Sequence, residues 1–192
     1  MYKEIFILPC SITVNKKLYK CEYNHELIHF LEIITQKGFY ELYEKFIFFD
    51  NLSKEDVISI IAVSVFKNHG TDGMNEVRDA LTKNPHLSTD DFARFRIYFK
   101  NLFPDLSKFN KEMDICPENN GKTSPSYNFE EVYALALNCL GWSDTEFWNA
   151  TPRKLCFALS AKSKYNEELE KRRDKIQKKN TVNLLNGIKA IL

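Results

Sequence analysis

The stretch KEDVISIIAVSVFKN, residues 54–68, contains the longest nearly apolar run of this chain. Its apolar side chains between Val57 and Phe66 lie almost all around a helix, and such a helix is stable only inside a core. Ser53 precedes the helix and Asp56 follows three residues later, which is typical of a capped helix start. The sequence therefore predicts a buried central helix, around which the neighbouring elements pack.

Helical patterns flank this stretch on both sides. Before it, Asn24 is placed to cap a helix that Gly38 would end, and a second apolar stripe covers residues 39–47. After it, a fourth stripe is followed by a fifth helix that Ser88 opens and Pro104 stops. We therefore expect four or five helices around one core. Their apolar positions are Leu27, Phe30, Leu31 and Ile34; Phe39, Leu42, Tyr43, Phe46 and Ile47; Met74, Val77 and Leu81; and Phe92, Phe95, Phe99 and Leu102.

Two β-rich runs precede the helices, at residues 4–9 and 12–23. The polar turn Asn15-Lys16-Lys17 interrupts the second run, which favours a small N-terminal hairpin or two-stranded ribbon. The expected fold class is therefore mainly α with α+β character. Residues 1–103 are expected to form a β-hairpin or ribbon with a helical bundle.

A small C-terminal helical module is expected after a linker. Residues 104–127 lose hydrophobic periodicity and gather Pro, Gly, Asn and Ser, which is linker composition. Residues 128–192 begin with three closely spaced helix starts, continue as a long polar helix and finish in an apolar tail. The three starts are Asn128, the capping box Ser143–Glu146, and Thr151 before Pro152.

Composition places the chain among ordinary globular proteins. It has 192 residues, of which 44% are hydrophobic and 28% charged, with a formal net charge of +1. Its 15 Phe and 9 Tyr against 6 Gly and 6 Pro exclude disordered and fibrous proteins. The longest nearly apolar run, residues 57–66, is about half of the roughly 20 residues that a membrane-spanning helix needs. Residues 5–8 are apolar but follow Glu4 and lack a small-residue cleavage signal, so we expect a cytoplasmic protein.

The cysteines point neither to disulfides nor to zinc. They form no C-x-x-C pair, and no two of them lie within ten residues of each other. We therefore expect reduced thiols that act as small hydrophobic side chains, and no cofactor. The five positions are Cys10, Cys21, Cys116, Cys139 and Cys156.

The nearly neutral total hides a strong local asymmetry of charge. Residues 1–111 carry 15 basic and 15 acidic side chains, a net charge of 0. Residues 112–146 carry one basic and seven acidic side chains, a net charge of −6. Residues 147–192 carry 11 basic and four acidic side chains, a net charge of +7. The basic run at residues 171–179 is a candidate phosphate-binding surface. Acidic residues such as Glu167 interleave with it and favour a solvated helix, so a nucleic-acid-binding or other adaptor protein is a disfavoured alternative.

The segment His25-Glu26-Leu27-Ile28-His29 matches the H-E-x-x-H pattern of zinc hydrolases. Two histidines one turn apart could hold a zinc ion, and Glu26 could act as general base on a metal-bound water. A third ligand is not evident, because His69 and His86 fall in expected turns. A zinc hydrolase that uses His25 and His29 is therefore the enzyme hypothesis, and solvent-facing or helix-edge histidines are the alternative.

The block FEEVYALALNCLGWSDTEFWNATPRKLCFALSAKS, residues 129–163, resembles the small tail assembly chaperones of phages and gene transfer agents. That family shows a helix ending in Leu-Gly, a capped Ser-x-x-x-Phe-Trp turn and a Thr-Pro-x-x-Leu helix start. Residues 1–103 resemble, over fewer features, a second tail-chaperone family encoded beside the major tail protein. The relatives are separate products, whereas here the two modules are joined. The matching positions are Leu140, Gly141, Ser143, Phe147, Trp148, Thr151, Pro152 and Leu155 in the second module, and the 12–23 ribbon, Leu31, Glu32, Ser53, Asp56 and Gly70 in the first.

This resemblance implies a non-enzymatic phage-tail assembly chaperone in the cytoplasm of a bacterial host. Its client is the long, hydrophobic tape-measure protein, with the tail-tube protein and a second copy of the chain as further candidate partners. Phe147 and Trp148 either form the core of the small module or help to dock a client helix. The last apolar stripe is expected to need a partner; it consists of Val182, Leu185, Ile188 and Leu192.

Overall fold

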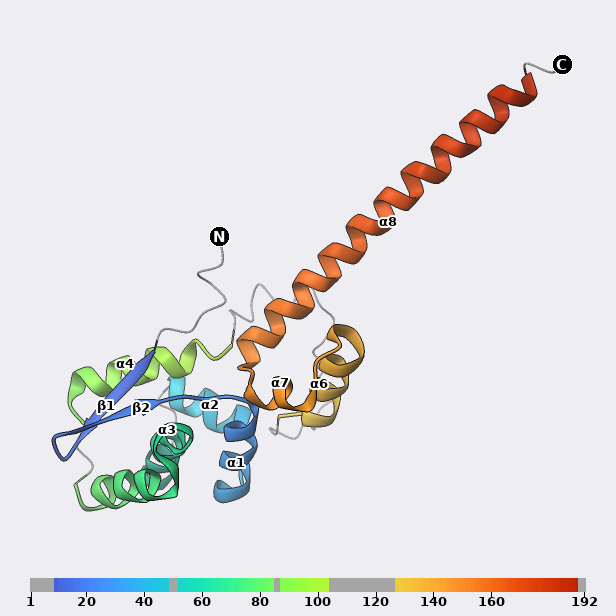
Figure 1. The fold of residues 1–192 in the computed structure, drawn as a ribbon. Helices are drawn as coiled ribbons and strands as arrows, with labels where there is room; N and C mark the ends of the chain where they lie inside the picture. The colour runs from blue at the N-terminus through green and yellow to red at the C-terminus, as the bar shows by residue number, and fades with distance from the viewer. Residues whose placement is uncertain (1–8, 49–51, 85–86, 104–126, 190–192) are drawn as a thin grey trace.

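The computed structural model describes residues 9–48, 52–84, 87–103 and 127–189, and for residues 176–189 it describes the backbone alone. Within them, a two-stranded sheet precedes a series of helices, which confirms the mainly α class with an N-terminal hairpin (Figure 1). The elements are β1 Cys10–Val14, β2 Lys17–Cys21, α1 His25–Thr35, α2 Phe39–Phe48, α3 Lys54–Lys83, α4 Thr89–Lys100, α6 Phe129–Leu135, the π-helical η1 Ala136–Leu140, α7 Asp144–Asn149 and α8 Pro152–Lys189.

Strands β1 and β2 form the expected hairpin. They pair antiparallel with Cys10 opposite Cys21, and the two-residue turn Asn15-Lys16 has positive φ at both positions, 49° and 64°, as a type I′ turn requires. β1 packs against α4 and β2 against α3. The cysteines of the described residues are free thiols, and the two in the hairpin are buried. Of the other predicted β run, residues 4–8 lie outside the described residues.

Helix α1 begins as the sequence predicts and ends earlier. The Asn24 side chain accepts a hydrogen bond from the Leu27 N–H at 2.9 Å. At the other end Gln36, with φ 54°, takes the left-handed position that the sequence suggested for Gly38. The Gln36 N–H still bonds to the Glu32 carbonyl at 2.9 Å, so the helix closes two residues before the glycine.

Helix α3 joins two segments that the sequence predicts separately, residues 54–68 and the stripe from Met74 to Leu81. Gly70 has φ 65° and ψ −168°, which interrupts the helical backbone between them. The kink folds the helix back on itself. As a result, Lys54 Nζ at the start of the helix donates to the Thr82 carbonyl near its end, at 3.2 Å.

The first half of α3 forms the centre of the main core, as expected. Ile60, Ile61, Ala62, Val63 and Val65 are all buried, and so are Ser59 and Ser64 between and beside them, so this part of the helix is buried all round. Aromatic rings from α2 and α4 pack on the same core and on one another; they include Phe39, Phe46, Phe95 and Phe99.

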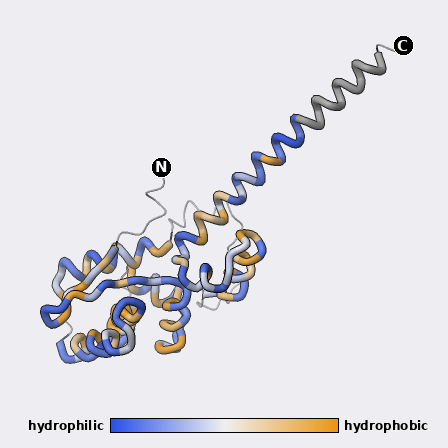
Figure 2. The backbone as a smooth tube through the Cα atoms, viewed as in Figure 1, coloured by the Kyte–Doolittle hydropathy of each residue, from blue (hydrophilic) through white to orange (hydrophobic). Residues whose placement is uncertain are grey.

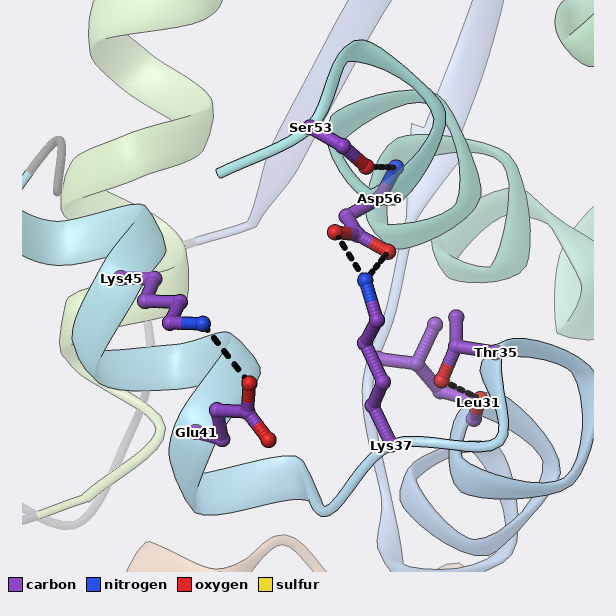
Figure 3. Close-up of polar contacts among 7 residues, drawn as sticks. All are labelled: Leu31, Thr35, Lys37, Glu41, Lys45, Ser53 and Asp56. Atoms are coloured by element: carbon purple, nitrogen blue, oxygen red, sulfur yellow. Dashed lines mark hydrogen bonds and ion pairs between the residues drawn. The ribbon is translucent and has the colours of Figure 1, made fainter. Parts of the chain in front are cut away.

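Asp56 ties the start of α3 to the turn between α1 and α2 (Figure 3). Its backbone N–H donates to Ser53 Oγ at 3.1 Å, while its two carboxylate oxygens accept from Lys37 Nζ at 2.8 and 2.6 Å. Burial alone would raise the pKa of Asp56, but the bonds from Lys37 and Ser53 outweigh it and hold the pKa below its ordinary value. The carboxylate is therefore charged and paired at neutral pH.

The three predicted helix starts of the second module are confirmed. Asn128 caps α6, the reciprocal Ser143–Glu146 box opens α7, and Thr151 Oγ accepts from the Lys154 N–H at 3.2 Å. Gly141, at φ 70°, ends η1. From Pro152 a single helix runs to Lys189 and projects away from the other helices (Figure 1). None of the described helices combines the length and apolarity that a bilayer crossing requires.

Candidate functional site: an aromatic junction and a projecting helix

His25, the first residue of α1, lies where three segments meet. It is fully buried, at 0% exposure, and its ring stacks on Phe147 with centroids 4.4 Å apart. Its Nδ1 lies 3.0 Å from the Phe147 carbonyl and its Nε2 lies 2.9 Å from the Tyr127 hydroxyl. A carbonyl only accepts, so Nδ1 carries the proton in the neutral ring and Nε2 accepts from Tyr127. Both ring nitrogens are therefore occupied within the protein.

Burial holds His25 in its neutral form. It lowers the pKa of the imidazole to about 4, although the backbone carbonyls of Phe147 and Ala150 act in the opposite direction. The His25 N–H also donates to the Ala150 carbonyl at 3.0 Å. This histidine thus fastens α1 to the end of α7.

The histidine pair does not have the arrangement that the zinc hypothesis needs. His25 is buried and bonded on both sides, whereas His29 is exposed and packs edge-on against Phe129 at 4.9 Å. Within the described ranges, no group of three or more His, Cys, Asp or Glu side chains could hold a metal ion. The alternative is solvent-facing or helix-edge histidines: His29 faces solvent, whereas His25 stands at the first position of α1 but is buried, and its bonding partners lie more than a hundred residues away.

The Phe147-Trp148 pair divides between core and surface. Phe147 is 0% exposed and belongs to a small core with Ala136, Leu155 and Leu159. Trp148 is only partly buried, and its ring lies 5.9 Å from Phe129. In this structure only Trp148 of the pair offers surface to a partner. Phe147 instead holds α7 against α1.

Partly buried apolar side chains pack against the small core. We call these side chains the aromatic junction. Four residues of this core are buried, whereas seven hydrophobic residues packed against it are only partly buried. Those seven are Phe129, Val132, Tyr133, Leu135, Leu140, Trp142 and Trp148. Two of them, Phe129 and Val132, also pack against the main core, so the junction joins both parts of the fold.

Polar contacts also join the second module to the first. Glu32 Oε1 on α1 accepts the Tyr127 N–H at 2.8 Å. Arg153 at the root of α8 donates to the carbonyls of Asn101 and Phe103, both at 3.1 Å. The second module therefore contacts both α1 and the end of α4. The proposed linker, residues 104–127, lies outside the described residues except for Tyr127.

Beyond its root, α8 is exposed. Side chains 161–168 and 170–175 are open to solvent, and Tyr165 is 57% exposed. Figure 2 shows this stretch as mostly hydrophilic, in contrast to the apolar helix root. Of the predicted apolar stripe, Val182, Leu185 and Ile188 lie where only the backbone is described, and Leu192 lies outside the described residues.

A separate apolar cavity of about 370 Å³ opens between the two ends of α3 and the start of α4. Ile61, Leu81, Leu87 and Phe92 contribute to its walls, and Lys54 also lines it. No sequence motif pointed to this cavity, because it exists only once Gly70 folds α3 back on itself.

Comparison of the chain with protein-family models, curated proteins and solved structures found no match. The junction contacts were also missed by sequence analysis. Tyr127 falls in a segment of linker composition, and Arg153 follows a helix cap without any distinguishing pattern. Their roles depend on contacts across about fifty to a hundred positions.

Proposed function

We propose that this chain is a non-enzymatic phage-tail assembly chaperone, of a prophage or gene transfer agent, that binds the tape-measure protein during tail morphogenesis. The client site is the aromatic junction, and the described part of α8 flanks it. The family resemblance of residues 129–163 supplies the identity of the client.

The observation that carries the proposal is the incomplete burial of the aromatic junction. A small core of four buried apolar side chains, with seven partly open ones packed around it, leaves more hydrophobic surface than that core can cover. Aromatic side chains in such positions are the residue types that dominate binding energy at interfaces. A tape-measure helix with apolar residues along one face is a partner of matching chemistry.

The test is co-purification with the co-expressed tape-measure protein. We expect the wild-type chain to capture the client, and Trp148→Ala to weaken the affinity at least about tenfold, as loss of an interface aromatic does. Ile97→Ala is the matched control, because Ile97 is 60% exposed on α4, outside the junction. Equal capture by both variants would remove the junction as the client site, and no capture by the wild type would remove the function.

A further inference from the structure

The exposed part of α8 carries a narrow apolar stripe that the other helices of the chain leave largely uncovered. Ala158, Ala161, Tyr165 and Leu169 are spaced at i, i+3, i+7 and i+11, which places them along one helix face. The helix root buries the adjoining face, through Leu155 and Leu159, which lie within about a third of a turn of Ala158. Ala158 and Leu169 are partly buried, whereas Ala161 and Tyr165 are exposed.

Helix α8 holds an acidic and a basic group of side chains of one chain apart. Exposed acidic residues occupy the first turns of α6 and α7, and exposed basic residues occupy the outer part of α8. Because α8 is continuous, Lys171 lies about 28 Å along the axis from Pro152, several times the screening length of about 8 Å. The acidic set is Glu130, Glu131, Asp144 and Glu146, and the basic set is Lys171, Arg172, Arg173 and Lys175.

We propose that two copies of this chain pair through antiparallel α8 helices. We place Ala161 at the two-fold axis. A residue that follows Ala161 by a given number of positions in one copy then faces the residue that precedes Ala161 by the same number in the other copy. Lys171 to Lys175 then extend past Pro152, the first residue of α8 in the other copy, towards α7, which ends three residues earlier at Asn149 and carries Asp144 and Glu146 in its first turn. Each basic segment thereby meets the acidic turns that it cannot reach in its own chain, and the contact is the same in both directions.

The side chains at the centre suit this arrangement. Ala158 and Ala161 are small, so the two helix backbones can approach to the 8–10 Å typical of packed helices. Tyr165 of each copy then covers the alanines of the other, and its ring leaves solvent. Nearby Arg172 and Glu168 of the same helix are 4.0 Å apart and mostly exposed, so their pairing does little to restrain the arginine from turning to another carboxylate.

The test is sedimentation equilibrium of the full chain with two sets of charge reversals. The basic-segment variant is Arg172→Glu with Lys175→Glu, and the acidic-turn variant is Glu130→Lys with Asp144→Lys. We expect a wild-type dimer that salt weakens, a dissociation constant raised at least about tenfold in each variant, and recovery to within about threefold when all four changes are combined.

Two further variants separate this interface from general effects of charge or folding. Lys20→Glu with Lys100→Glu reverses two exposed charges outside α8 and is expected to leave the dimer unchanged. Tyr165→Glu is expected to produce monomers with an unchanged helical circular dichroism signal. A monomeric wild type up to about 100 μM, a dimer that survives Tyr165→Glu, or a combined variant that does not recover would each overturn the proposal.

Discussion

At the scale of single residues, His25 decides how the two parts of the fold are joined. Its imidazole donates to a carbonyl on α7 and accepts from Tyr127, and burial lowers its pKa to about 4 from the ordinary 6.5. The unfolded chain therefore takes up the proton at a higher pH than the folded chain. The stabilisation is complete above pH 6.5 and is lost as the pH falls towards 4.

The first prediction follows from this difference in pKa. We expect the free energy of unfolding to fall by about 3 kcal/mol through His25 alone between pH 7 and pH 4. Urea unfolding of the wild type and of His25→Gln at several pH values measures it. Carboxylates titrate in both proteins, so the difference between the two pH profiles isolates the histidine. Parallel profiles would contradict the assignment.

The second prediction concerns the Asp56–Lys37 pair. We expect Asp56→Asn to lower the free energy of unfolding by about 1 kcal/mol, because the carboxylate is nearly buried although its lysine partner is 39% exposed. Glu41→Gln is the matched control, since it removes a more open Glu41–Lys45 pair on α2 (Figure 3) and should cost less than about 0.5 kcal/mol. Equal losses in chemical denaturation would show that Asp56 does not fasten α3 to the preceding turn.

Sequence reasoning succeeded at the helix starts and failed at the junction, for a physical reason. The caps at Asn24, Ser53, Ser88 and Asn128 bond to N–H groups three residues along the chain, so each is contained in a short stretch of sequence. His25 bonds instead to Tyr127 and Phe147, which only the folded chain brings near it.

At the scale of elements, the shape of the main core depends on the kink in α3. Gly70 has φ 65° and ψ −168°, a combination open essentially to glycine alone, whereas Gly141 has the ordinary left-handed values of a helix end, 70° and 25°. An added Cβ would contact nothing within 4 Å at either position. Any loss of stability on substitution therefore comes from the backbone.

The third prediction compares these two glycines. We expect Gly70→Asn to lower the free energy of unfolding by about 2 kcal/mol and Gly141→Asn by less than about 1 kcal/mol, because asparagine tolerates the left-handed region but not the conformation at Gly70. Thermal and urea unfolding of the two variants provide the comparison. A greater loss at Gly141 would contradict this account of the kink.

The fourth prediction concerns the end of α8. Removing residues 180–192 deletes the apolar positions Val182, Leu185, Ile188 and Leu192, so we expect weaker capture of the tape-measure protein. The α8 pairing should persist, because Ala161, Tyr165 and Lys175 remain. Co-purification and sedimentation of the truncated chain measure the two effects separately. Undiminished capture would exclude the tail as a client contact.

At the scale of the whole molecule, the net charge of +1 conceals two oppositely charged segments. The sequence predicted their signs and the helices that bear them, but not that a continuous α8 would separate them. Nor did it predict that Tyr127 and Arg153 would bind the second module to α1 and α4. The proposed molecule therefore has a rigidly joined body with an open aromatic junction, and a projecting helix free to pair.

We expect this chain to protect a hydrophobic client, and the solubility of the tape-measure protein measures that protection. The tape-measure protein is expressed alone and with the full chain, and its fraction in the cleared lysate is measured. We expect the tape-measure protein to pellet when it is expressed alone and to stay soluble in complex with the chain. A tape-measure protein that pellets equally in both cultures would contradict the account.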